Sequence, residues 1–320
     1  MSSVITVTAD DLALPLEQHV ARTSAALDAY GHLIALASPD PADPGRRRLH
    51  TVRAALEADR MAIVPVDLPP LAAALLAEQL RQLAGTDLGP GVLAGAARLL
   101  SYYLYSGALL GSVSKLDRVP VTVGKHFKSL VPGRHFAVMA HPEPGLSEAG
   151  PDAVPPGPGF LTQLAVAGHG LDAGWVTGPL AAAWRTQHIR EVPLPEGSAR
   201  WWGTGRLVEF TAYIADIGIL YQLVTSVRRD TCPWCGLEVI GDQCLFCSTR
   251  LGDRSDRGDR SSDRSSDRSD RTQQVAAREQ PLRRPQQQRP PQYQPQHQRQ
   301  EPPSRELPTP NRPQLEPHKR

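Results

Sequence analysis

The sequence has no apolar run long enough to span a membrane. A spanning helix needs about 20 consecutive apolar residues. The two longest candidates are residues 99–114, which contain no charged side chain, and residues 210–227, which contain only Asp216. A carboxylate near the middle of a bilayer costs roughly 3 kcal/mol. We therefore expect both stretches to be buried core helices, and we predict no membrane partner.

The first residues lack the marks of a secretory signal. Residues 1–18 have neither a basic segment nor an apolar run, and they carry Asp10 and Asp11. We therefore expect a cytoplasmic protein. A reducing compartment keeps thiols free to bind metal, which agrees with the cysteine pattern described below.

The chain also has little net charge. Its formal charge is +2 at pH 7. Residues 1–250 hold 20 basic against 23 acidic side chains, whereas residues 251–320 hold 15 against 10. Because binding to nucleic acid depends on a surplus of cations facing the phosphates, the overall charge does not indicate a nucleic-acid-binding body.

Recognised catalytic patterns are missing as well. Neither G-x-S-x-G nor G-x-G-x-x-G occurs, and the ten histidines show no zinc-ligand spacing. We predict no catalytic residue. Because catalytic groups can converge in space from distant parts of a chain, an enzyme with an unrecognised site in the helical domain remains an alternative.

The strongest signal is the spacing of the cysteines. All four stand within 16 residues, as C-x2-C, eight residues and C-x2-C. Two close pairs are the usual source of a tetrahedral Zn²⁺ site, since each pair directs two thiolates at one point. We predict one Zn²⁺ ion bound by Cys232, Cys235, Cys244 and Cys247. Four thiolates would fill its coordination sphere, so the predicted zinc is structural.

Residues 231–251, with CPWCG followed by CLFC, resemble a zinc ribbon built from two zinc knuckles. The resemblance implies that Pro233 shapes the first turn and that Gly236 relieves the backbone after the second thiolate. Ser248 departs from the family, which usually has glycine after the last cysteine. CPWC is also similar to the glutaredoxin active site, but that site needs a thiolate at a helix N-terminus and no second pair, so zinc is favoured.

Basic side chains of the body concentrate in one stretch, residues 115–134. On the functional interpretation it contacts phosphate or nucleic acid, and on the alternative it is one solvated face. The candidate contacts are Lys115, Arg118, Lys125, Lys128 and Arg134.

Three tryptophans are candidates for a partner surface. Trp201 and Trp202 are adjacent and cannot both face one core from a regular helix or strand. Trp234 lies inside the first cysteine pair and offers apolar surface. Its docking against the protein's own domain is the alternative.

Apolar periodicity predicts a mainly α fold with a small β insertion. We expect helices in the first 115 residues and at about 160–168, 179–190 and 207–227, a β-hairpin at about 119–140 and a loop at 141–159. The predicted domains are a mainly helical domain (1–228), the zinc ribbon (229–250) and a disordered tail (251–320). The tail is rich first in Arg, Asp and Ser and then in Gln, Pro and Arg.

Together these features predict a non-enzymatic, zinc-ribbon-containing adaptor or regulatory protein whose partner is another protein. The second alternative is a nucleic-acid-associated protein that uses the Lys115–Arg134 strip and the cationic tail.

Overall fold

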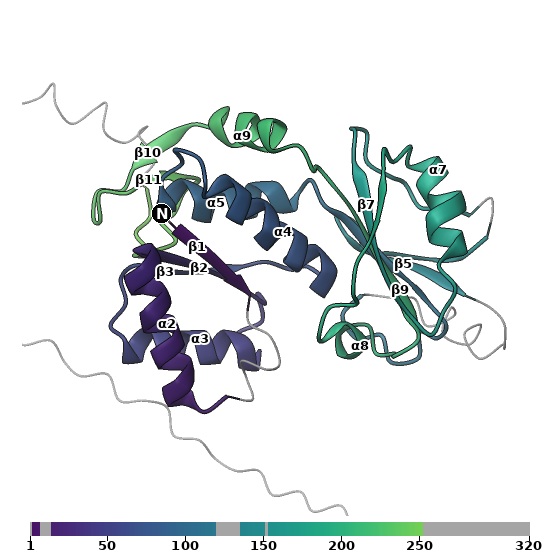
Figure 1. Ribbon diagram of the computed structural model, residues 1–320, viewed down its shortest axis with the longest axis horizontal. Helices are drawn as coiled ribbons and strands as arrows, with labels where there is room; N and C mark the ends of the chain where they lie inside the picture. Colours follow the sequence, from purple (N-terminus) through teal and green to yellow (C-terminus); the bar gives the residue numbers. More distant parts are fainter. Residues whose placement is uncertain (1, 7–13, 120–134, 151–152, 252–320) are drawn as a thin grey trace, which may run out of the picture. The chain divides into compact units, whose positions relative to one another are not determined.

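The structure is a computed structural model that describes residues 2–6, 14–119, 135–150 and 153–251 (Figure 1). Contacts divide the chain into Met1–Arg260 and Ser261–Arg320, and every described residue belongs to the first unit. Beyond residue 251 the predicted tail lies outside the described residues. The predicted limits of the helical domain and the zinc ribbon stay predictions.

The N-terminal part is a parallel three-stranded sheet in the order β1-β2-β3 with two helices on each face (Figure 1). The strands are β1 (Ser2–Thr6), β2 (His32–Ala37) and β3 (Met61–Pro65). The helices are α2 (Leu16–Tyr30), α3 (Pro44–Ala55), α4 (Pro70–Leu83) and α5 (Pro90–Ser101). Proline occupies the first turn of α3, α4 and α5, where its missing N–H costs nothing.

Side chains of β2 alternate between two apolar layers. Leu33 and Ala35 pack with α2 and α3, whereas Ile34 and Leu36 pack with α4 and α5. Because both faces are covered, the strand after His32 is apolar throughout and shows no polar alternation.

The second sheet has six strands in the order β6-β5-β4-β9-β7-β8, with every pair antiparallel except β7 and β8. Its strands are β4 (Tyr105–Leu110), β5 (Phe136–His141), β6 (Gly145–Glu148), β7 (Gln163–His169), β8 (Ile189–Glu191) and β9 (Leu207–Tyr213). A π-helical turn (Val176–Leu180) followed by α7 (Ala181–Ala183) covers one face, and the short helix α8 (Ser198–Trp201) lies at the other.

The chain then passes through α9 (Ile217–Thr225) to a two-stranded antiparallel sheet, β10 (Arg229–Thr231) and β11 (Glu238–Ile240), which carries the cysteines. Asp216 begins α9 as its N-cap, because its side chain accepts a 3.0 Å hydrogen bond from the Ile219 amide. It is therefore not a carboxylate inside a helix.

The prediction of a mainly α fold is wrong, because two sheets organise the described residues. The expected helix at 207–227 is strand β9 followed by α9, and the expected helix at 160–168 overlaps strand β7. Strand β4 likewise occupies the middle of the uncharged stretch 99–114. A strand covered on both faces is a continuous apolar run, which periodicity does not distinguish from a buried helix.

Strand β5 overlaps the end of the predicted hairpin at 119–140, but it pairs with β4 and β6. Residues 120–134 of that hairpin lie outside the described residues. Strand β6 falls within the predicted loop at 141–159. Within the described part of the chain, no helix has the length and apolarity needed to cross a membrane.

Candidate functional site

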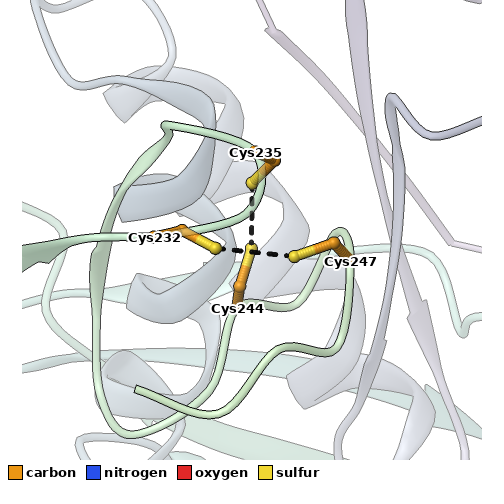
Figure 2. A group of neighbouring side chains, drawn as sticks. All are labelled: Cys232, Cys235, Cys244 and Cys247. Carbon is orange, nitrogen blue, oxygen red and sulfur yellow. Dashed lines mark hydrogen bonds between the residues drawn. The ribbon is translucent and has the colours of Figure 1, made fainter. Parts of the chain in front are cut away.

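The four cysteines converge on one point, as Figure 2 shows. Their Sγ atoms all lie within 4.8 Å of one another. The Sγ atoms of Cys232 and Cys247 are 3.5 Å apart, and those of Cys235 and Cys244 are 3.6 Å apart. A tetrahedral ion with Zn–S bonds of about 2.3 Å would place its sulfurs about 3.8 Å apart. The cluster therefore has the donor type, the number and the spacing to hold a metal ion.

Two loops of the same construction present the thiols. In each loop the amide four residues after the first cysteine donates to that cysteine's carbonyl, at 3.0 Å for Gly236 to Cys232 and at 2.8 Å for Ser248 to Cys244. Both donors have left-handed backbone conformations, with φ +72° at Gly236 and +64° at Ser248. Ser248 therefore adopts the glycine-like geometry without being glycine, a conformation that strains most side chains.

The first cysteine of each loop is also held through its own amide. Cys232 donates to the carbonyl of Leu237 at 2.8 Å, and Cys244 donates to the carbonyl of Thr249 at 2.9 Å. These bonds fix the direction of each loop at its start. In this structure, backbone hydrogen bonds within each loop thus position the thiols.

The cysteine segment packs directly on α5, where two glycines leave room for it. A Cβ atom on Gly91 would lie 2.4 Å from the carbonyl oxygen of Glu238, and one on Gly95 would lie 2.4 Å from Cγ1 of Ile240. Val239 and Ile240 are buried in this contact. Glycine at these two positions thus lets β11 approach the helix backbone.

A second contact anchors the other cysteine loop to the N-terminal sheet. Phe246 is fully buried, and its ring meets His32 edge-on with 5.6 Å between the ring centroids. The guanidinium of Arg53 donates to the carbonyl of Phe246. The cysteine cluster is therefore part of the same packed unit as the parallel sheet.

The thiols of Cys235 and Cys247 differ in their readiness to ionise. Burial raises the pKa of Cys235 to about 12. Burial also acts to raise the pKa of Cys247, but hydrogen bonds with the side chain and backbone of Thr249 and with the thiols of Cys232 and Cys244 outweigh it and lower that pKa to about 6. A thiolate is the species that binds metal, so an incoming ion must displace protons from this cluster.

The three tryptophans predicted as a partner surface lie in different surroundings. Trp202 is fully buried, Trp201 is partly buried, and Trp234 is 81% exposed. The rings of Trp201 and Trp202 lie 4.3 Å apart at 64°. The structure therefore does not bring the three together on one surface.

Of the five predicted basic contacts, only Lys115 and Arg118 fall within the described residues, and both are exposed. Lys125, Lys128 and Arg134 lie outside them. Gly203, at φ +68°, allows its backbone to approach the Lys115–Arg118 segment closely. A Cβ atom on Gly203 would lie only 2.0 Å from the carbonyl oxygen of Lys115. This approach brings Trp201 and Arg118 to one crevice.

The crevice has a volume of about 190 Å³ and opens beyond the carboxyl ends of β2 and β3. Two arginines and two aspartates line it, namely Arg46, Arg118, Asp43 and Asp67. Sequence analysis named Arg118 and Trp201 for separate reasons and missed that they meet here. No local pattern connects them, since they come from different elements and meet only through the tertiary fold.

Sequence analysis also missed Glu209, a fully buried carboxylate in β9. Its Oε1 accepts a 2.8 Å hydrogen bond from the amide of Leu71 in the first turn of α4. Burial raises its pKa to about 7, although the nearby Ser198 and Trp202 side chains act to lower it. Neither of them reaches Oε2 with hydrogen-bond geometry, so within the described residues that oxygen has no partner.

The chain matches no protein-family model and no curated protein. It is similar to solved structures with low sequence identity. One is a DegV family protein from Corynebacterium glutamicum, at 12% identity and TM-score 0.46 over 63% of this chain and 83% of that one. Another is a DegV lipid-binding protein from Thermotoga maritima, at 13% identity and TM-score 0.48 over 63% and 76%.

A third similar structure is a DegV family protein from Thermus thermophilus that is described by its fatty-acid binding, at 14% identity and TM-score 0.46 over 61% and 76% of the two chains. The prediction of a zinc-ribbon adaptor is therefore wrong. The similar structures are fatty-acid-binding and other DegV proteins, and the apolar face of the cysteine segment is buried against α5. The predictions of a protein partner and of a nucleic-acid partner are corrected as well, because several similar structures are described by the fatty acids that they bind.

Proposed function

We propose that the four cysteines bind one structural Zn²⁺ ion, which fastens residues 229–251 to α5 and to the N-terminal sheet. The observation that carries the proposal is the convergence of Cys232, Cys235, Cys244 and Cys247, with all Sγ atoms within 4.8 Å. Four thiolates around zinc leave no coordination position for water or substrate, so the ion stabilises the fold and performs no chemistry.

The packing explains why this segment needs an ion. Between the two cysteine pairs, only the three residues of β11 form regular structure, and they pair with the three residues of β10. A two-stranded sheet of this size is marginal on its own. By joining the two cysteine pairs, the metal would close the loop of backbone between them. The apolar side chains of that loop, Val239 and Ile240, would then stay in contact with Gly91 and Gly95.

The direct test is metal analysis of the full chain, purified without chelator and dialysed against metal-free buffer. We expect one equivalent of zinc per chain, no iron absorption, and release of the ion when all four thiols are modified. Replacing Cys244 by serine should abolish stoichiometric binding. Exposed Ser226→Ala, close to the cluster in sequence, is the matched control and should keep it.

A preparation with less than half an equivalent of any divalent metal, which also fails to take up added Zn²⁺, would contradict the proposal. If the protein contains one equivalent of iron, the four cysteines form a metal site as proposed but the bound metal is iron and not zinc. A tetrahedral set of four thiolates accepts either metal.

The structural role has its own readout. We expect a chelator strong enough to strip the ion to expose the backbone of residues 229–251 to protease, with the first cuts near the exposed Trp234. Cleavage that is equally slow with and without the ion would show that the metal does not hold this segment in place.

A further inference from the structure

The crevice lies at the carboxyl ends of β2 and β3, which is the end of the strands at which open α/β sheets bind ligands. Its floor follows β2 through Ala37 and Ser38 and continues from β3 through Val66 and Asp67. The far wall comes from a different part of the fold, through Trp201. The ends of β2 and β3 therefore line one side of this space, and α8, through Trp201, lines another.

The charges of the crevice are balanced. Arg46 and Arg118 supply two positive groups, and Asp43 and Asp67 supply two negative ones. Asp43 is partly engaged, because one of its oxygens accepts from the amide of Arg46 at the start of α3. Asp67 and Arg118 are exposed, and neither forms an ion pair with another described residue. A ligand that carries one sign of charge would therefore meet a like charge as well as an opposite one.

Apart from Ser38, the uncharged lining residues are apolar, and the volume of the crevice limits the size of the ligand. Leu36, Leu68 and the partly buried Trp201 are among these lining residues. The volume of about 190 Å³ is close to the ~150 Å³ that holds a benzene molecule and is below the range of roughly 300–1,000 Å³ typical of drug-sized ligands. The space therefore fits a compact side chain and not a long acyl chain.

We propose that this crevice binds a small zwitterion of amino-acid size. Its carboxylate faces Arg46 and Arg118, its ammonium group faces Asp67, and its apolar part lies against Trp201. This arrangement pairs each ligand charge with an opposite one, whereas a simple carboxylate would leave Asp67 beside an anion and a simple amine would leave Arg118 beside a cation.

The first experiment screens the full chain, in its metal-loaded form, against the twenty protein amino acids by thermal shift and titration calorimetry. We expect saturable binding of at least one apolar amino acid. Two matched analogues of the best ligand, one without its amino group and one without its carboxylate, are then titrated. Each analogue should bind about tenfold more weakly or worse, which corresponds to ~1.4 kcal/mol.

Three single variants assign the charges. Arg118→Gln should weaken the zwitterion and the carboxylate analogue alike, whereas Asp67→Asn should remove the preference for the zwitterion over that analogue. Lys115→Gln is the matched control, because Lys115 is exposed in the same segment but does not line the crevice, and it should change nothing. Unfolding curves of each variant separate lost binding from lost folding.

Two outcomes overturn the proposal. One is the absence of saturable binding by any of the twenty amino acids. The other is a carboxylate analogue that binds the unaltered protein as tightly as the zwitterion does. The zinc content of the same preparation is independent of both results, so this inference and the proposed function fail separately.

Discussion

The amide of Leu71 donates a 2.8 Å hydrogen bond to the buried side chain of Glu209, which joins the first turn of α4 to the middle of β9. Burial, only partly compensated by this bond, raises the pKa of Glu209 from 4.5 to about 7. At neutral pH the protein therefore keeps, where β9 meets α4, a buried carboxyl group near the midpoint of its ionisation.

The consequence is a stability that falls as pH rises. Between pH 4.5 and about 7 the folded protein keeps a proton on Glu209 that the unfolded chain has released. The free energy of unfolding contributed by this group is thus complete below pH 4.5 and is lost as pH rises through 7. For a shift of this size the loss is about 3 kcal/mol at most.

Glu209→Gln keeps the acceptor for Leu71 and cannot ionise. We expect the variant to be more stable than the unaltered protein at pH 8, by about 1–3 kcal/mol, and to lose that advantage at pH 5. Denaturant unfolding at both values measures this. Glu196→Gln, which changes an exposed glutamate, is the control. Equal gains at both pH values would show that ionisation of Glu209 is not the cause.

The same residue illustrates what sequence analysis reached and what it missed. The cysteine cluster was predictable because its four members lie within 16 residues, and their spacing alone implies convergence. Glu209 stands in an apolar run that fits a helix as well as a strand, and the residues that make it unusual, Leu71 and Trp202, come from other elements. Burial of this kind is a property of tertiary packing.

The prediction of one helix at 207–227, where the structure has β9 and α9, was wrong for a physical reason. The run from Leu207 to Val227 is apolar because β9 is covered on both faces and α9 packs on α4 and α5. Asp216 marks the boundary between them as a helix cap. In the sequence it looks like a single carboxylate within one long helix, because a capping residue and a buried acid have the same local pattern.

Ser248 gives a second prediction. It occupies the left-handed conformation that Gly236 occupies in the matching loop, and a residue with a Cβ atom is strained there. We expect Ser248→Gly to stabilise the metal-loaded protein by about 1 kcal/mol, measured by thermal unfolding. The reciprocal change, Gly236→Ala, should destabilise it by a similar amount. Loss of stability in Ser248→Gly would show that the serine side chain contributes more than its backbone strain costs.

The contact between α5 and β11 gives a third. Replacing glycine by alanine inside a helix usually adds about 1 kcal/mol of stability. At Gly95 the added Cβ would lie 2.4 Å from the Ile240 side chain and 2.8 Å from its carbonyl oxygen, so β11 must move. We expect Gly95→Ala to cost about 1–3 kcal/mol and to speed proteolysis of residues 229–251.

Gly178→Ala is the matched control for that change, because Gly178 lies in a helical turn and a Cβ atom there meets nothing within 4 Å. It should be neutral or stabilising in the same unfolding assay. If Gly95→Ala behaves like Gly178→Ala, then β11 does not rest against the helix as closely as the structure indicates.

A fourth prediction concerns the ion pair between α4 and β8. Arg190 donates two parallel hydrogen bonds to Glu78, at 3.0 and 2.9 Å, and its guanidinium lies 5.3 Å from the ring centre of Tyr213. The hydrogen bonds from Arg190 lower the pKa of Glu78, so the pair stabilises the fold above pH 4.5 and this contribution is lost as pH falls through the lowered pKa.

The side chains of Arg190 and Glu78 are 34% and 41% exposed, so solvent screens the pair and we expect Glu78→Gln to cost only about 0.5–1 kcal/mol at pH 7. Arg190→Met should cost more, since it also removes the cation from the Tyr213 ring.

A double-mutant cycle at pH 7 and pH 3 isolates the interaction between Glu78 and Arg190, and the coupling energy should shrink at the lower pH. The pair of Arg228 and Asp230, whose arginine is 68% exposed, is the control and should show little coupling at either pH. Coupling between Glu78 and Arg190 that is unchanged at pH 3 would mean that their attachment of α4 to β8 does not depend on the carboxylate charge.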